Sequence, residues 1–127
     1  MNAKGTERPL SPHLQVYRPQ LTSAMSILHR MCGAALAVGT LMVTWGLLAA
    51  VAGEGAWEQF SGFSRSPVGT LMIFCWSAAL YYHLCNGVRH LIWDTVRLID
   101  IKGAYRAGYT VLASAALLTA LTWWGRL

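Results

Sequence analysis

The sequence predicts an all-α integral membrane protein, a bundle of three transmembrane helices. Of its 127 residues, 55% are hydrophobic and only 12% are charged, and three long stretches contain almost no charge. Each stretch is near or above the roughly 20 residues that a helix needs to cross about 30 Å of hydrocarbon. A soluble domain would need polar residues at regular spacing to cover its core, and these stretches lack them.

The three predicted spans are residues 23–52, 67–93 and 107–124. The second span has a clear start, because Ser66 precedes Pro67. Serine can accept a hydrogen bond from a free amide of the first turn, and the missing N–H of proline is harmless there. The first 20 residues lack the apolar core of a cleavable signal peptide, so we expect the first span to be retained. The chain thus divides into an amino-terminal segment, 1–22, and a membrane unit, 23–127.

The basic residues predict the orientation of the bundle. Three precede the first span and three lie between the second and third spans: Lys4, Arg8, Arg18, Arg97, Lys102 and Arg106. The opposite side carries only Arg65 and Arg126. Because short loops rich in lysine and arginine stay in the cytoplasm, we expect a cytoplasmic amino terminus and a periplasmic carboxyl terminus.

Charge and cysteine content restrict the classes of partner. The net charge of +5 is concentrated on the predicted inner face, where it can meet anionic lipid or an acidic protein. No basic-aromatic pattern of a nucleic-acid binder accompanies it. Cys32, Cys75 and Cys85 form no CxxC pair, so we expect reduced thiols that act as small hydrophobic side chains.

The histidines are the main functional candidates, because ionisable side chains are costly inside an apolar span. His83 and His90 are nearly two helical turns apart and should face the same side of the second span. His83 is expected near the bilayer midplane, with His90 about 10 Å closer to the cytoplasm. His29 and Arg30 are expected at the inner end of the first span, at about the depth of His90.

Haem is one interpretation of this arrangement. A haem with two histidine ligands needs imidazoles on opposite faces of the ring, which one helix cannot supply. At its predicted depth His83 has no counterpart in this chain, so a second ligand would come from another subunit. Positive donors for the haem propionates would then come from an inner group of His29, Arg30, Arg89 and His90. Two alternatives stay open. In the first, His83 only forms a hydrogen bond between helices and the arginines extend to the lipid headgroups. In the second, His29 and His90 hold a haem within this chain.

Three motifs identify a family resemblance. Residues 8–17 read RPLSPHLQVY, residues 26–30 read SILHR with Gly33 following, and His83 is followed by GVRH at 87–90 and by Asp94. In this order they closely resemble the cytochrome b membrane-anchor subunits of succinate dehydrogenase, respiratory Complex II. The resemblance covers nearly the whole chain and implies the same three-span fold.

The resemblance implies roles for individual residues. His83 would be an axial ligand of one haem b, and the other axial histidine would come from a second, smaller anchor subunit. His29 and His90 would lie near the propionates, with Arg30 and Arg89 helping.

A ubiquinone site is also implied at the cytoplasmic membrane edge, formed by Ser26 and Arg30, one helical turn apart. A hydroxyl can donate to a quinone carbonyl, and a guanidinium can stabilise negative charge as electrons arrive. The alternative for Ser26 is a hydrogen bond from its hydroxyl to the backbone of its own helix. The alternative for Arg30 is a side chain that extends to the lipid headgroups. Asp94 is a candidate proton relay, the alternative being an ion pair with Arg89 or Arg97.

The function implied is a membrane anchor that passes electrons from succinate oxidation to quinone. The flavoprotein and iron-sulfur subunits would carry out the oxidation, since this sequence has no dinucleotide motif or cysteine cluster. The isolated chain is therefore expected to be inactive. Alternatives are a fumarate reductase anchor, a haem-free structural anchor and a self-contained cytochrome. A bacterial inner membrane is favoured over the mitochondrial one, because no Arg- and Ser-rich presequence precedes the first motif.

Overall fold

The computed structural model describes residues 18–125, and these form an all-α structure. Four helices follow in order: α1 (Leu21–Ala52), α2 (Glu54–Arg65), α3 (Pro67–Asp94) and α4 (Ile101–Trp123). The prediction of an all-helical fold is confirmed for this part of the chain. The first motif, at 8–17, and the basic residues Lys4, Arg8 and Arg126 lie outside the described residues, as does most of the predicted 1–22 segment.

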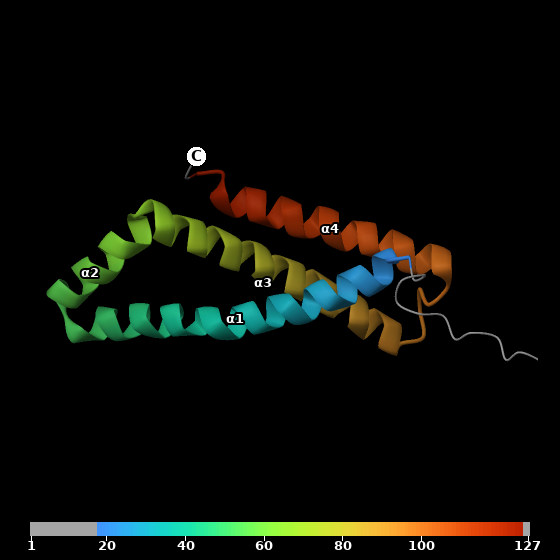
Figure 1. The fold of residues 1–127 in the computed structure, drawn as a ribbon, viewed down its shortest axis with the longest axis horizontal. Helices are drawn as coiled ribbons and strands as arrows, with labels where there is room; N and C mark the ends of the chain where they lie inside the picture. The colour runs from blue at the N-terminus through green and yellow to red at the C-terminus, as the bar shows by residue number, and fades with distance from the viewer. Residues whose placement is uncertain (1–17, 126–127) are drawn as a thin grey trace, which may run out of the picture.

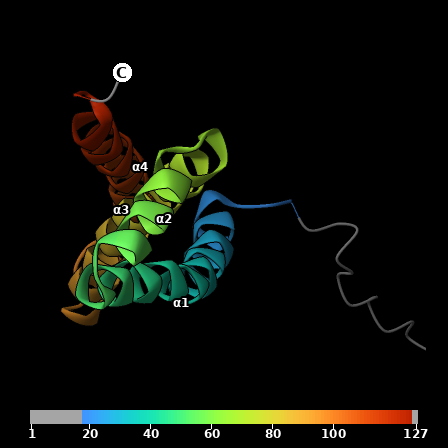
Figure 2. The ribbon, with the colours of Figure 1, turned by 90° about the vertical axis from the view of Figure 1, so that its left-hand side faces the viewer.

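Helix α3 lies at the centre of the fold. It packs against α1 on one side and α4 on the other, and α2 joins the far ends of α1 and α3 (Figures 1 and 2). The start of α1, the end of α3 and the start of α4 therefore meet at one end of the molecule, while α2 and the end of α4 lie at the other (Figure 1). The motifs at 26–30 and 83–94 belong to elements that meet at the first of these ends.

Helix α2 was not predicted from the sequence. Gly53 interrupts the helical backbone with a φ of 112°, a conformation that disfavours any residue with a Cβ, and α2 begins directly after it. The rings of Phe60 and Phe63 pack on Trp45 of α1, with centroid separations of 5.1 and 5.3 Å. At 12 residues α2 is too short to span a bilayer, so its sequence contains no apolar run of membrane length.

Side-chain caps set the starts of α3 and α4. The Ser66 hydroxyl accepts from the backbone N–H of Gly69 at 3.1 Å, and Pro67 follows it, as the sequence predicts. Asp100 caps α4 in the same way, accepting from the N–H of Gly103 at 3.0 Å. Because of this cap α4 begins at Ile101, well before the predicted boundary at 107.

The surface of the chain is unusually apolar for a folded monomer. On α1 alone Val51 is 88% exposed and Leu41 71% exposed, while the buried core is small. By length and composition α1 and α3 can each cross a membrane. Helix α4 is long enough, at about 35 Å, but carries Lys102 and Arg106 in its first two turns, and its membrane crossing stays a prediction.

Candidate functional site

Three histidines meet where α1 crosses α3. His29 comes from α1, and His83 and His90 come from α3; we call them the histidine cluster. The His29 ring stacks on the His83 ring with a centroid separation of 3.9 Å and an angle of 4° between the planes. The His90 ring lies 5.3 Å from that of His29, and all three side chains are half-buried. Both α3 histidines therefore face α1, which confirms that they share one side of the helix.

The expectation that no histidine of this chain lies level with His83 is wrong. Measured along the helix axis, His29 lies about 12 Å from the first residue of α1. Measured in the same way, His83 and His90 lie about 16 and 6 Å from the last residue of α3. Since these two helix ends meet, His29 falls between the other two histidines and contacts both. The error came from placing His29 level with His90.

A backbone hydrogen bond determines the tautomer of His83. Its Nδ1 lies 3.1 Å from the main-chain oxygen of His29. A carbonyl oxygen can only accept, so Nδ1 must carry a proton, and in the neutral imidazole Nε2 then keeps its lone pair. Histidines that bind metals are typically held in this way by the second ring nitrogen. Gly33 adds room, because a Cβ there would come within 3.1 Å of the His83 Cε1 atom.

The cluster contains an unsatisfied polar atom. The Nδ1 atom of His29 is buried and has no hydrogen-bond partner among residues 18–125. A buried polar group without a partner costs about 1–3 kcal/mol, so it is a natural contact for a polar ligand group.

Two buried polar residues extend the cluster toward α4. Asn86, with no exposed surface, accepts a hydrogen bond from Arg89 Nη1 at 3.2 Å and lies 3.4 Å from His90 Nε2. Arg89 is 2% exposed, and its Nη2 donates to the main-chain oxygen of Ala104 at 3.0 Å. Arg89 thus faces α4 and reaches His90 through Asn86. Sequence reasoning missed Asn86, although an amide inside an apolar helix, between two histidines, marks the position.

The other predicted site residues lie at the same end of the fold. Ser26 is half-buried and Arg30 is exposed, one turn apart on α1, and Asp94 is exposed at the end of α3. Within residues 18–125 none of the three makes a hydrogen bond or an ion pair, so Asp94 forms neither of the ion pairs considered from the sequence. No polar contact within the described residues therefore gives these three side chains a part in holding the fold together.

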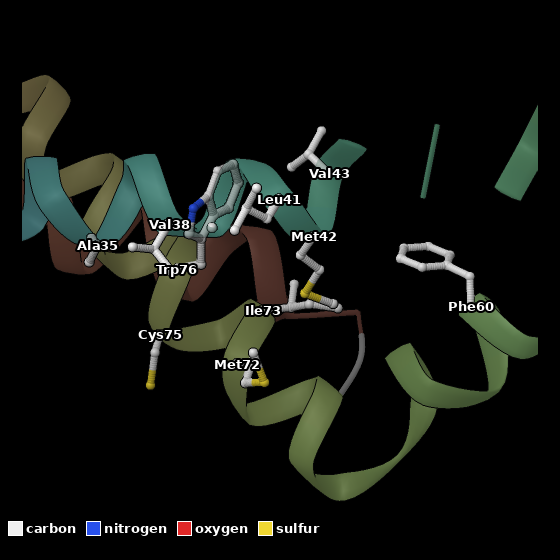
Figure 3. Close-up of a pocket in the computed structure, with 12 residues that line it drawn as sticks. Ala35, Val38, Leu41, Met42, Val43, Phe60, Met72, Ile73, Cys75 and Trp76 are labelled. Atoms are coloured by element: carbon white, nitrogen blue, oxygen red, sulfur yellow. The ribbon is translucent and has the colours of Figure 1, made fainter. Parts of the chain in front are cut away.

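An apolar cavity of about 570 Å³ lies between α1 and α3, with Phe60 of α2 at its far side (Figure 3). Ala79 and Trp76 line it and precede His83 by about one and two turns on the same face of α3. The indole of Trp76 lies against α1 in Figure 3 and donates to the Leu36 oxygen at 3.4 Å. A Cβ at Gly39 would overlap that indole, so the close approach depends on glycine.

Known proteins provide an independent comparison. The family model described as succinate dehydrogenase/fumarate reductase transmembrane subunit matches residues 4–122. The succinate dehydrogenase cytochrome b556 subunit of Paracoccus denitrificans is 40% identical over 115 residues, covering 91% of this chain and 88% of that protein. That of Rickettsia typhi is 37% identical over 117 residues, covering 92% and 91%. The mitochondrial succinate dehydrogenase cytochrome B subunit of Schizosaccharomyces pombe is 40% identical over 119 residues, covering 87% and 64%.

Proposed function

Because the chain belongs to the succinate dehydrogenase/fumarate reductase transmembrane subunit family, we propose that it binds haem b jointly with a second anchor subunit and forms one side of a ubiquinone-reduction site. Its relatives are named as cytochrome b subunits of succinate dehydrogenase, and that name supports a haem b. The chain itself is a membrane-anchor subunit, and the oxidation of succinate belongs to the flavoprotein and iron-sulfur subunits.

The observation that carries the proposal is the hydrogen bond between His83 Nδ1 and the His29 carbonyl oxygen. With Nδ1 as the donor, the neutral form of His83 has its Nε2 lone pair available to the iron that it would hold. The haem, when bound, supplies a one-electron redox centre.

The residues around His83 fit a haem in their polarity. On the polar side of His83 lie His29, with its unsatisfied Nδ1, and His90. These two side chains can hold the propionates together with Arg30. Arg89 can contribute indirectly, through its hydrogen bond to Asn86. On the other side lies the apolar cavity beyond Ala79. A porphyrin has the same division, since two carboxylates project from one edge of an otherwise apolar ring.

The stacking of His29 on His83 supports a second ligand from a partner subunit. Axial imidazoles point at the iron from opposite faces of the porphyrin, so the ring must lie between them. The two imidazoles are parallel and 3.9 Å apart, which leaves no space for a porphyrin between them. The rings of His29 and His90 are only 5.3 Å apart, so an intrachain haem held between these two histidines is disfavoured as well.

The quinone site is proposed at the meeting point of the start of α1 and the end of α3. Ser26 would donate to one quinone carbonyl, and Arg30 would stabilise the negative charge that develops before protons arrive. Asp94, exposed at the end of α3, would pass those protons on. The absence of internal partners for these three within the described residues supports this assignment.

The topology is proposed to be three spans, with α4 as the third, a cytoplasmic amino terminus and a periplasmic carboxyl terminus. Arg97, Lys102 and Arg106 support it, because they cluster at the α3–α4 end of the fold. We place the complex in a bacterial inner membrane. A fumarate reductase anchor would use the same residues in the opposite direction of electron flow.

The test is the reduced-minus-oxidised absorbance spectrum of the purified complex. A His83→Gly variant should lose the haem band, and added imidazole should restore it by filling the vacated ligand position. Cys85→Ala, two residues further along α3, is the matched control and should keep the band. A haem band that persists in His83→Gly without imidazole would exclude His83 as ligand. A wild-type complex without any haem band would point to the haem-free structural anchor.

A further inference from the structure

The contacts of Asn86 determine the orientation of its side-chain amide. Arg89 has only N–H donors, so the atom that faces Arg89 Nη1 at 3.2 Å must be the Asn86 oxygen. The amide nitrogen therefore points at His90 Nε2, 3.4 Å away. Asn86 has no exposed surface, so bulk water does not compete for either contact.

This orientation determines which nitrogen of His90 carries the proton. The amide NH₂ of asparagine only donates, so Nε2 of His90 must accept. A neutral imidazole has one N–H, which is then located on Nδ1. Nδ1 of His90 has no hydrogen-bond partner within residues 18–125, so its N–H is free to donate to a ligand.

Arg89 is in turn fixed by α4. Its Nη2 donates to the Ala104 oxygen at 3.0 Å, and its guanidinium lies 4.0 Å above the ring of Trp93. Trp93 donates to the Leu98 oxygen at 3.1 Å and so holds the α3–α4 connection. A continuous series of contacts therefore runs from the first turn of α4 through Arg89 and Asn86 to His90.

We propose that Asn86 is a positioning residue that holds His90 with its Nδ1–H as the donor toward a haem propionate. This inference rests on the proposed function, in which His90 lies beside that carboxylate. A donated hydrogen bond offsets the negative charge of the propionate, and that charge favours ferric haem. Without Asn86 the proton of His90 can move to Nε2, the donor is lost, and the haem midpoint potential should fall.

The experiment measures the haem midpoint potential by spectroelectrochemical titration of the purified complex. Asn86→Leu keeps the branched shape of the side chain and removes both hydrogen bonds. Loss of one hydrogen bond should change the ferric/ferrous equilibrium constant by about three- to tenfold. Thr119→Val is the control, because Thr119 is also buried but its hydroxyl bonds, within residues 18–125, only to the Ala115 oxygen of its own helix. If Asn86→Leu does not assemble, Asn86→Ala takes its place.

A double-mutant cycle with His90→Phe decides whether Asn86 acts through His90. We expect His90→Phe to lower the potential and Asn86→Leu to add nothing in that background. Equal effects of Asn86→Leu in both backgrounds, or no effect in either, would overturn the proposal. So would loss of haem from both Asn86 variants while His90→Phe retains it, because Asn86 would then act in folding. A wild-type complex without haem would instead refute the proposed function.

Discussion

Replacing Gly39 by alanine tests the close approach of α1 and α3. A Cβ at residue 39 would overlap the indole of Trp76, which must then leave its position. The move breaks the hydrogen bond from Trp76 to the Leu36 oxygen, at a cost of about 0.5–1.5 kcal/mol. Overpacking adds about 1–3 kcal/mol. We therefore expect Gly39→Ala to lower the free energy of unfolding by roughly 2–4 kcal/mol.

The assay is denaturation of the purified complex by SDS, followed by far-ultraviolet circular dichroism. Gly62→Ala on α2 is the matched control, because a Cβ there meets no atom within 4 Å. Alanine in that helix should leave stability unchanged or raise it by up to about 1 kcal/mol. Adding Trp76→Phe to Gly39→Ala should recover part of the loss, since a smaller ring relieves the overlap. Equal midpoints for Gly39→Ala and Gly62→Ala would refute the reasoning.

Three further substitutions test other contacts. Arg89→Met should lower the free energy of unfolding by about 1–3 kcal/mol, because Asn86 is left with an unpaired buried oxygen; an unchanged midpoint in the same SDS titration would contradict this. Tyr82→Phe removes a buried hydrogen bond to the Met25 oxygen, 2.9 Å long, and should cost about 1 kcal/mol in that titration. Arg30→Gln should reduce ubiquinone reduction by about 10²-fold or more while electron transfer from succinate to a soluble dye stays normal, and equal losses in both assays would exclude a quinone role.

The sequence predicts some features of the fold better than others. Long apolar runs identify α1 and α3, and the Ser66–Pro67 pair marks the start of α3 within one residue. Helix α2 is not found in this way, because its 12 residues are too short for a membrane span, although Trp57, Phe60 and Phe63 recur at helical spacing. The start of α4 was misplaced because the Asp100 cap was overlooked.

The candidate site was predictable in its residues more than in its geometry. Helical spacing places His83 and His90 on one face, and the structure agrees. The position of His29 relative to His83 and His90 depends on the offset between α1 and α3 along their axes. The spacing of residues within one helix does not specify that offset. Asn86 acts through neighbours on two helices, so its importance appears only when those helices are packed together. The family is established by the comparisons, whereas the ligand and quinone roles remain predictions.

The partner of His83 is a main-chain oxygen, and this has a consequence for how the site can change. No substitution at position 29 removes a peptide carbonyl, so the tautomer of His83 is insensitive to which side chain stands there. A slide of α1 past α3 by about an ångström would stretch this 3.1 Å contact beyond hydrogen-bonding range. Displacement of a helix, caused by a neighbouring subunit or by a change in bilayer thickness, would therefore alter the hydrogen bond of His83 more than a substitution of the His29 side chain would.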